Sequence, residues 1–187
     1  MRFWIVLLVL WLSSGPVWAS PLDRAATQAW ASGLQALARE DWPTALTALH
    51  RTVSLPDYPK YEAKRLGALS NRCLVYIQLQ HYRRAIADCS AALAAGPTEA
   101  ALLNRGIAYH RLHRFERAAA DFTAALRLVP HSAEAWLDRA LVYRDLGQLQ
   151  QARHDLQQAA TCCDRRGPLY RYIRQTLESL PGNTATA

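Results

Sequence analysis

The sequence repeats itself with a period of 33 to 34 residues, and this period restricts the fold more than any other feature. The segment from Glu99 to Pro130 shows the unit, in which two apolar runs with helical spacing flank a short basic turn at His113 and Arg114. Such a turn is short enough to require antiparallel packing of its two helices. A single helical hairpin leaves an apolar face uncovered. The repeat therefore predicts an all-α stack of antiparallel helix pairs, each packed against the next.

Copies of the unit lie on both sides of this segment. Equivalent positions of three successive copies hold Asn71, Asn104 and Asp138; Arg72, Arg105 and Arg139; Tyr76, Tyr109 and Tyr143; Ala85, Ala118 and Ala152; and Asp88, Asp121 and Asp155. We expect repeats at about 26–55, 66–97, 99–132 and 133–160. Ala45 and Ala85 are 40 residues apart, so an insertion at 55–67 follows the first repeat. This insertion predicts a loop and an extended first helix in the second repeat, in which Tyr58, Pro59 and Tyr61 fill the gap or, alternatively, bind a ligand.

The order of residues within the unit resembles the tetratricopeptide repeat. That family places Trp, Leu, Gly, Tyr, Ala, Phe, Ala and Pro along a helix-turn-helix. Seven of these positions, spread over two repeats, are matched here by Trp136, Gly106, Tyr109, Ala118, Phe122, Ala125 and Pro130. The resemblance covers residues 66–160 and implies a right-handed superhelical solenoid of about four repeats. Residues 168–180 form the expected C-terminal capping helix, because an apolar side at helical spacing can close the end of the stack. Residues 181–187 are expected to be a disordered tail.

The first 19 residues predict export. Their apolar run from Phe3 to Leu12 is about half the ~20 residues that span a bilayer comfortably. Val17-Trp18-Ala19 fits a signal-peptide cleavage site, which leaves Ser20 as the mature N-terminus. An uncleaved anchor is the alternative, with Trp11 and Trp18 at a lipid interface. We expect residues 20–187 to form one solenoid domain in the periplasm, in the thylakoid lumen or outside the cell, without stable membrane insertion after cleavage.

The formal charge of +7 comes almost entirely from arginine. A basic balance can indicate nucleic acid or an anionic membrane as partner. Here the arginines are spread through every repeat among carboxylates, and export argues against nucleic acid, so we expect a solvated, ion-paired surface. Each Arg of the repeated Arg/Asp set stands sixteen residues before its Asp, with the turn midway. This spacing predicts an ion pair between the two helices of each hairpin, and an arginine ladder for an anionic ligand is the alternative.

Cysteines occupy two positions that face each other in the second repeat. Cys73 stands where the third repeat has Gly106, and Cys89 stands where it has Phe122. An exported protein can form a disulfide there, and two buried thiols are the alternative. Cys162 and Cys163 are adjacent, so they are free, pair between molecules, or bind a metal with His154. Because no ligand spacing supports a metal, we expect none.

No catalytic motif is present in the sequence. It lacks a nucleophile elbow, an HExxH motif and a glycine-rich phosphate loop. His110 and His113 are three residues apart at a helix end, which is compatible with a metal site, but we expect no carboxylate or cysteine partner nearby and interpret them as surface histidines. We therefore predict a non-catalytic protein without a cofactor.

Similarity to tetratricopeptide proteins implies that the first helices line a concave groove that recognises a partner protein or peptide. The groove residues implied by this resemblance are Asn71, Leu74, Gln78, Asn104, Ile107, Arg111, Asp138, Leu141 and Asp145. The family's carboxylate clamp is not expected, because its basic positions here hold Ala100, Asn104, Glu134 and Asp138. The sequence thus predicts an interaction scaffold or assembly factor that binds an extended segment of a partner. The alternative is a permanent structural subunit that packs through the convex face or the capping helix.

Overall fold

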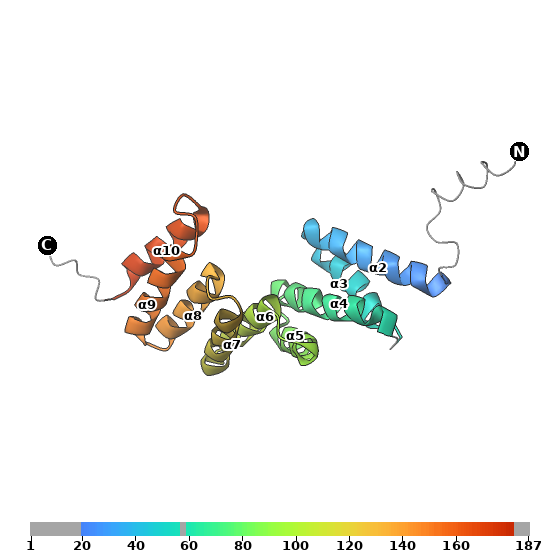
Figure 1. Cartoon of the computed structure of the whole chain (residues 1–187), viewed down its shortest axis with the longest axis horizontal. Coiled ribbons are helices and arrows are strands. Elements are labelled where there is room, and N and C mark those ends of the chain that lie inside the picture. The colour runs from blue at the N-terminus through green and yellow to red at the C-terminus, as the bar shows by residue number, and fades with distance from the viewer. Residues whose placement is uncertain (1–19, 57–58, 182–187) are drawn as a thin grey trace, which may run out of the picture. The chain divides into compact units, whose positions relative to one another are not determined.

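The computed structural model describes residues 20–56 and 59–181, and the regular elements of these residues are all helices (Figure 1). The helices are α2 (Pro21–Ala38), α3 (Trp42–Val53), α4 (Pro59–Gln78), α5 (Tyr82–Ala95), α6 (Glu99–Arg111), α7 (Phe115–Leu128), α8 (Ala133–Asp145), α9 (Leu149–Thr161) and α10 (Pro168–Ser179). This confirms the predicted all-α repeat fold. The predicted signal peptide at 1–19, Tyr58 of the insertion and residues 182–187 of the predicted tail lie outside the described residues. Within the described ranges, no helix combines the length and the apolar character needed to cross a membrane.

The chain divides into two compact units, with the boundary between Arg65 and Leu66. The N-terminal unit contains the hairpin of α2 and α3 and the first residues of α4. Asp23 joins the start of α2 to the start of α4, because its Oδ1 accepts a hydrogen bond from the hydroxyl of Tyr61 at 2.6 Å and lies 2.8 Å from Nζ of Lys60. Tyr61 is only 2% exposed. Among the insertion's aromatic residues, Tyr61 therefore has the packing role that the sequence predicted.

In the C-terminal unit, which begins at Leu66, each helix from α5 to α10 packs on the next. One apolar cluster surrounds Phe122 of α7 and a second surrounds Leu156 of α9. Helix α10 contributes Ile173 to the second cluster, and Leu180 follows it there, so α10 covers the apolar end of the stack. The extended first helix expected after the insertion is α4, which is 20 residues long.

The first helix of every hairpin ends in the same reversal. At equivalent turn positions the backbone is left-handed, with φ of 56° at Glu40, 60° at Gln80, 56° at His113 and 74° at Gly147. The residue after each of these donates its backbone N–H to a carbonyl five residues back, as Arg114 does to Tyr109 at 2.9 Å. This is the Schellman motif. Three of the four turns therefore place a residue with a side chain in a conformation that costs about 1–2 kcal/mol outside glycine.

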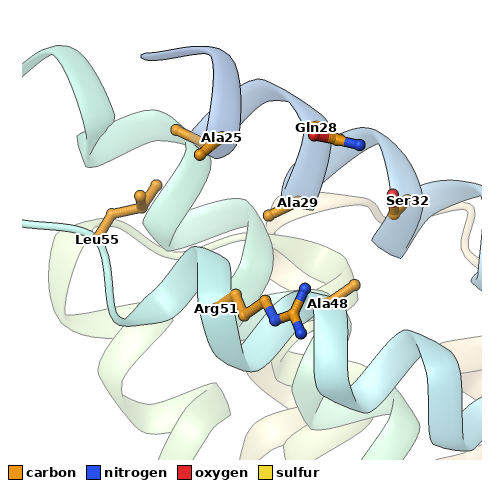
Figure 2. A pocket seen from close by; sticks show the side chains of 8 residues that line it. Ala25, Gln28, Ala29, Ser32, Ala48, Arg51 and Leu55 are labelled. Carbon is orange, nitrogen blue, oxygen red and sulfur yellow. The ribbon is translucent and has the colours of Figure 1, made fainter. Parts of the chain in front are cut away.

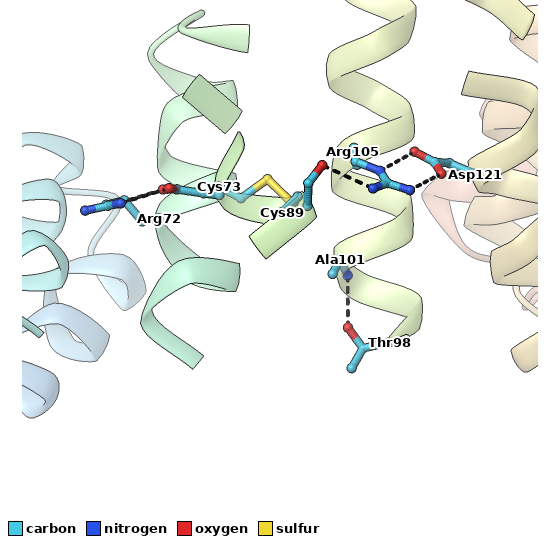
Figure 3. The surroundings of a disulfide bond; sticks show 9 residues. Arg72, Cys73, Cys89, Thr98, Ala101, Arg105 and Asp121 are labelled. Carbon is cyan, nitrogen blue, oxygen red and sulfur yellow. Dashed lines mark hydrogen bonds and ion pairs between the residues drawn. A yellow bond between two sulfur atoms is a disulfide. The ribbon is translucent and has the colours of Figure 1, made fainter. Parts of the chain in front are cut away.

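Facing positions of the two helices in each hairpin are complementary in size. They hold Gly33 and Leu49, Cys73 and Cys89, Gly106 and Phe122, and Ala140 and Leu156. The closest approach is at Gly106, where an added Cβ would lie 2.6 Å from Cε1 of Phe122. In the second repeat a disulfide joins Cys73 to Cys89 with 5.5 Å between the Cα atoms (Figure 3). A covalent bond there takes the place of the small-against-large packing of the other hairpins.

Candidate functional site

Three interhelical ion pairs hold the first helices of the C-terminal unit. In the third repeat, Nε and Nη2 of Arg105 donate to the two carboxylate oxygens of Asp121 at 2.8 and 2.7 Å (Figure 3). Arg72 and Asp88, and likewise Arg139 and Asp155, form the same two-bond pair. The predicted ion pairs are thus confirmed. Because each of these guanidinium groups is matched by its own carboxylate, the set is poorly suited to the alternative of an arginine ladder for an anion.

The third nitrogen of two of these arginines reaches the preceding repeat. Nη1 of Arg105 donates to Oγ of Ser90 on α5 at 3.1 Å, and Nη1 of Arg139 donates to Oγ1 of Thr123 on α7 at 3.0 Å. Each guanidinium therefore binds both its own hairpin and the second helix of the hairpin before it. These contacts set the register of α6 and α8 relative to their neighbours.

The nine predicted groove residues lie on the first helices α4, α6 and α8, and we call the surface that they form the first-helix face. Helices α6 and α8 contact each other directly, although α7 separates them in the chain. Six of the nine are half-buried and three are exposed; the half-buried ones are Asn71, Leu74, Asn104, Ile107, Asp138 and Leu141, and the exposed ones are Gln78, Arg111 and Asp145. None is fully buried, so all nine have surface that a ligand can reach.

Asn71 and Asn104 carry side-chain amides that make no hydrogen bond to any other described residue. The two residues are one repeat apart on α4 and α6. An amide offers two donor hydrogens and an acceptor oxygen. Unpaired amides at a half-buried surface position can bind the backbone of an extended chain without restricting its sequence.

Asp138 continues the same row on α8, but its chemistry differs from that of the two amides. Burial, the largest cause, and the negative charge of Glu134 together raise the pKa of its carboxyl to about 7, against the opposing effect of Arg111 on α6. Within the described chain its carboxyl forms no hydrogen bond. At neutral pH this group is partly protonated, so it can donate as well as accept a hydrogen bond.

His110 has a carboxylate partner that the sequence analysis missed. Its Nε2 lies 2.7 Å from Oδ2 of Asp145 on α8. The prediction that His110 has no carboxylate nearby was wrong. It was based on neighbours in the sequence, whereas the stacking of hairpins brings together residues that are one repeat apart. Burial raises the pKa of Asp145, but hydrogen bonds from His110 and Arg144 outweigh it and the net pKa is lowered. Asp145 is therefore already paired, and Arg111 is the more available charge on this face.

Cys162 and Cys163 are free thiols in the turn between α9 and α10. Both are half-buried, and burial raises the pKa of the Cys163 thiol. No group of three or more His, Cys, Asp and Glu side chains in the described ranges is arranged to hold a metal ion. His154, the metal partner considered from the sequence, lies instead 3.1 Å from Asp155 through Nδ1.

The N-terminal unit has a hollow of about 290 Å³ between α2 and α3 (Figure 2). Small side chains line most of it, including Ala25, Ala29 and Ala48, and Arg51 is the cation on its wall. The lining residues of this hollow all belong to the N-terminal unit, whereas those of the first-helix face all belong to the C-terminal unit.

The helical hairpins, their recurring turn and their ion-paired stacking define an α-solenoid of the kind that serves as a protein–protein interaction module. The profile of the tetratricopeptide repeat family matches residues 73–120 and 103–169. Together the two matches cover more than half of the chain, and the protein therefore belongs to the tetratricopeptide repeat family. No curated protein matches this sequence.

Solved structures of other repeat proteins share this fold. A tetratricopeptide repeat protein from Parabacteroides merdae is 20% identical with a TM-score of 0.67, and the match covers 83% of this chain but only 59% of that one. A thermophilic tetratricopeptide repeat protein from Thermus thermophilus is 23% identical with a TM-score of 0.67, over 82% of this chain and 81% of that one. The second repeat domain of human RPAP3, solved in complex with an HSP70 peptide, is 22% identical with a TM-score of 0.53, over 59% of this chain and 92% of that one.

Proposed function

We propose that this protein is exported and acts outside the cytoplasm as a non-catalytic scaffold or assembly factor. It binds an extended segment of a partner protein along the first-helix face. The observation that carries this proposal is the row of Asn71 and Asn104, whose amides have no partner among the described residues. A polar group held half-buried without a partner is unfavourable, and a bound backbone relieves that penalty. Leu74, Ile107 and Leu141 beside the row supply apolar contact area.

Export is supported by two independent features. Residues 1–19 have the pattern of a cleavable signal peptide, and the Cys73–Cys89 disulfide suits an oxidising compartment. Intact-mass measurement of the native protein should therefore find Ser20 as the first residue. A full-length mass in the membrane fraction would remove the proposal of a cleaved, exported chain.

Neutral replacement of the two amides tests the binding face. Asn71→Ala with Asn104→Ala should weaken capture of the partner from native cells by about 1–2 kcal/mol, because two backbone hydrogen bonds are lost. Helix content and thermal unfolding should stay nearly unchanged, since the amides bind nothing within the described chain. Gln151→Ala with Gln157→Ala is a matched control, because it removes two exposed amides from the second helix α9, outside the residues of the first-helix face.

A permanent structural subunit is the second candidate function, and one observation favours it. Tyr172 on the capping helix α10 is 49% exposed, and the neighbouring Arg171 and Arg174 are exposed as well. If capture survives the double amide change but is lost when Arg171 and Arg174 are replaced, the partner binds α10 and the groove proposal is wrong.

A further inference from the structure

The arginines of the C-terminal unit fall into two sets with different surroundings. Arg72, Arg105 and Arg139 are paired with aspartates inside the hairpins. A second set stands at the edge where the first helices turn into the second helices; its members are Arg83, Arg84, Arg114 and Arg117. These four side chains are exposed, and none has a carboxylate partner among the described residues. We call the surface formed by residues 80–84 and 112–117 the turn edge.

Two of the four arginines are positioned without being neutralised. The guanidinium of Arg84 lies over the ring of Tyr76 at 5.9 Å, and that of Arg117 lies over the ring of Tyr109 at 5.7 Å. Stacking on an aromatic face orders a guanidinium but leaves its charge and most of its N–H donors unused. The turn edge therefore presents cations that are already oriented for an anion.

A hollow of about 450 Å³ lies at this edge. The α4–α5 turn supplies most of its lining, from Gln80 to Arg84, and Leu112 comes from the end of α6 in the next repeat. The hollow thus spans the turns of two successive repeats. Tyr82 and Leu112 give it half-buried apolar walls, and Arg83 and Arg84 place positive charge beside them.

Negative charge is scarce at this edge. Of the carboxylates between residues 79 and 120, Asp88 is paired with Arg72, and Glu99 lies in the first turn of α6, at the opposite end of that helix. Among residues 80–84 and 112–117, Glu116 is the one carboxylate beside four arginines, so the turn edge carries about three of the chain's seven net positive charges. The expectation that arginines are interleaved with carboxylates holds inside the hairpins but fails here.

We propose that the turn edge binds an acidic segment of a protein, in which an apolar side chain lies between carboxylates. The apolar side chain enters the hollow against Tyr82 and Leu112, and the flanking carboxylates accept hydrogen bonds from Arg83 and Arg114. Guanidinium groups recognise carboxylates through paired N–H donors, which gives such a contact its geometric specificity.

A protein segment fits this edge better than a lipid surface does. The large apolar side chains that are exposed in the described chain are those of Leu22, Leu34, Leu128, Val129 and Tyr172, and none of these residues belongs to the turn edge. The turn edge therefore has no exposed large apolar side chain to insert between lipids. Its apolar side chains line a hollow instead. This site is separate from the first-helix face and goes beyond the proposed function.

The test uses the mature chain, a fluorescein-labelled peptide Glu-Glu-Phe-Glu-Glu and fluorescence anisotropy at low salt. Arg83→Gln with Arg114→Gln should weaken peptide binding about tenfold or more, because two charge-assisted hydrogen bonds are lost. Arg165→Gln with Arg166→Gln makes the same change of net charge at the exposed α9–α10 turn, and its affinity should stay within about twofold of wild type. The Asn71→Ala and Asn104→Ala variant should bind the peptide as wild type does, which separates this site from the first-helix face.

Four results overturn the proposal. The first is equal weakening by both arginine pairs, which means attraction to net charge alone. The second is equal binding of Gln-Gln-Phe-Gln-Gln, which removes the role of the carboxylates. The third is no binding of the acidic peptide at millimolar concentration. The fourth is tighter, Arg83- and Arg114-dependent binding to vesicles of anionic lipid or to single-stranded DNA, which makes the partner a different class of macromolecule.

Discussion

Gly106→Ala should lower the free energy of unfolding, although alanine is the better helix former. Gly106 lies inside α6, where alanine gains about 1 kcal/mol over glycine from helix propensity alone. The added Cβ would lie 2.6, 2.9 and 3.0 Å from three ring atoms of Phe122, and that ring is 0% exposed. Overpacking of this kind costs about 1–3 kcal/mol, so we expect a net loss of about 1 kcal/mol.

The fourth repeat suggests the compensating change. Its equivalent positions hold Ala140 and Leu156, which pack without a glycine. Phe122→Leu alone leaves unfilled space beside Gly106 and should cost about 1–2 kcal/mol. The double variant with Gly106→Ala and Phe122→Leu copies the fourth repeat, so it should be more stable than the sum of the two single changes by about 2 kcal/mol.

Urea unfolding followed by circular dichroism measures all four proteins of this double-mutant cycle. A single transition with an unchanged dependence on urea is required, because repeat arrays can unfold in parts. Additivity within about 0.5 kcal/mol would contradict this prediction, since it would show that the Phe122 ring does not contact the Cβ at position 106. A gain of stability on Gly106→Ala alone would refute it as well.

Two further predictions concern the disulfide and Asp138. The Cys73–Cys89 bond spans 16 residues, and its reduction by dithiothreitol should lower the urea midpoint by an amount that corresponds to about 3 kcal/mol. The variant with Cys73→Ala and Cys89→Ala should not respond to dithiothreitol. If the wild type responds no more than the variant, the bond is not formed in the native protein. The pKa of Asp138 is raised from 3.8 to about 7 in the folded state, so between these pH values the folded chain holds a proton that the unfolded chain has lost. The free energy of unfolding should therefore fall as the pH rises from about 4 to about 7. The full shift corresponds to about 4 kcal/mol, but solvent at this half-buried position should reduce it to about 1–2 kcal/mol. The same pH dependence in Asp138→Asn would assign it to other groups.

Much of the architecture follows from the sequence because equivalent residues recur at a fixed spacing in each repeat and therefore pack in the same way. Asn104, Arg105 and Tyr109 recur at the same spacing on either side, so the position of each helix, its turn and its facing partner can be derived from one copy. The pairing of Cys73 with Cys89 and of Arg105 with Asp121 depends only on equal distances from a turn, and the structure contains both. The capping helix can be predicted for the same reason. In the C-terminal unit, each hairpin before the last covers its apolar face with the next hairpin, and α10 covers that of the last one.

The sequence also places the nine residues of the first-helix face on equivalent helices, but it does not describe their surroundings. Whether they bind a partner stays a prediction, which the double amide variant tests. Their electrostatics depend on distances between repeats, as the pairing of His110 with Asp145 and the opposing effects of Glu134 and Arg111 on Asp138 show.

The fold class, the helix pairs and the contacts within one hairpin follow from the sequence, because these depend on local periodicity and on short loops. The charge contacts between hairpins depend on the tertiary structure. His110 pairs with Asp145, 35 residues later in the chain, whereas Arg117 stacks on Tyr109 and has no carboxylate partner among the described residues. These contacts depend on the stacking of one hairpin on the next, which brings side chains more than 30 residues apart in the chain within a few ångströms of each other.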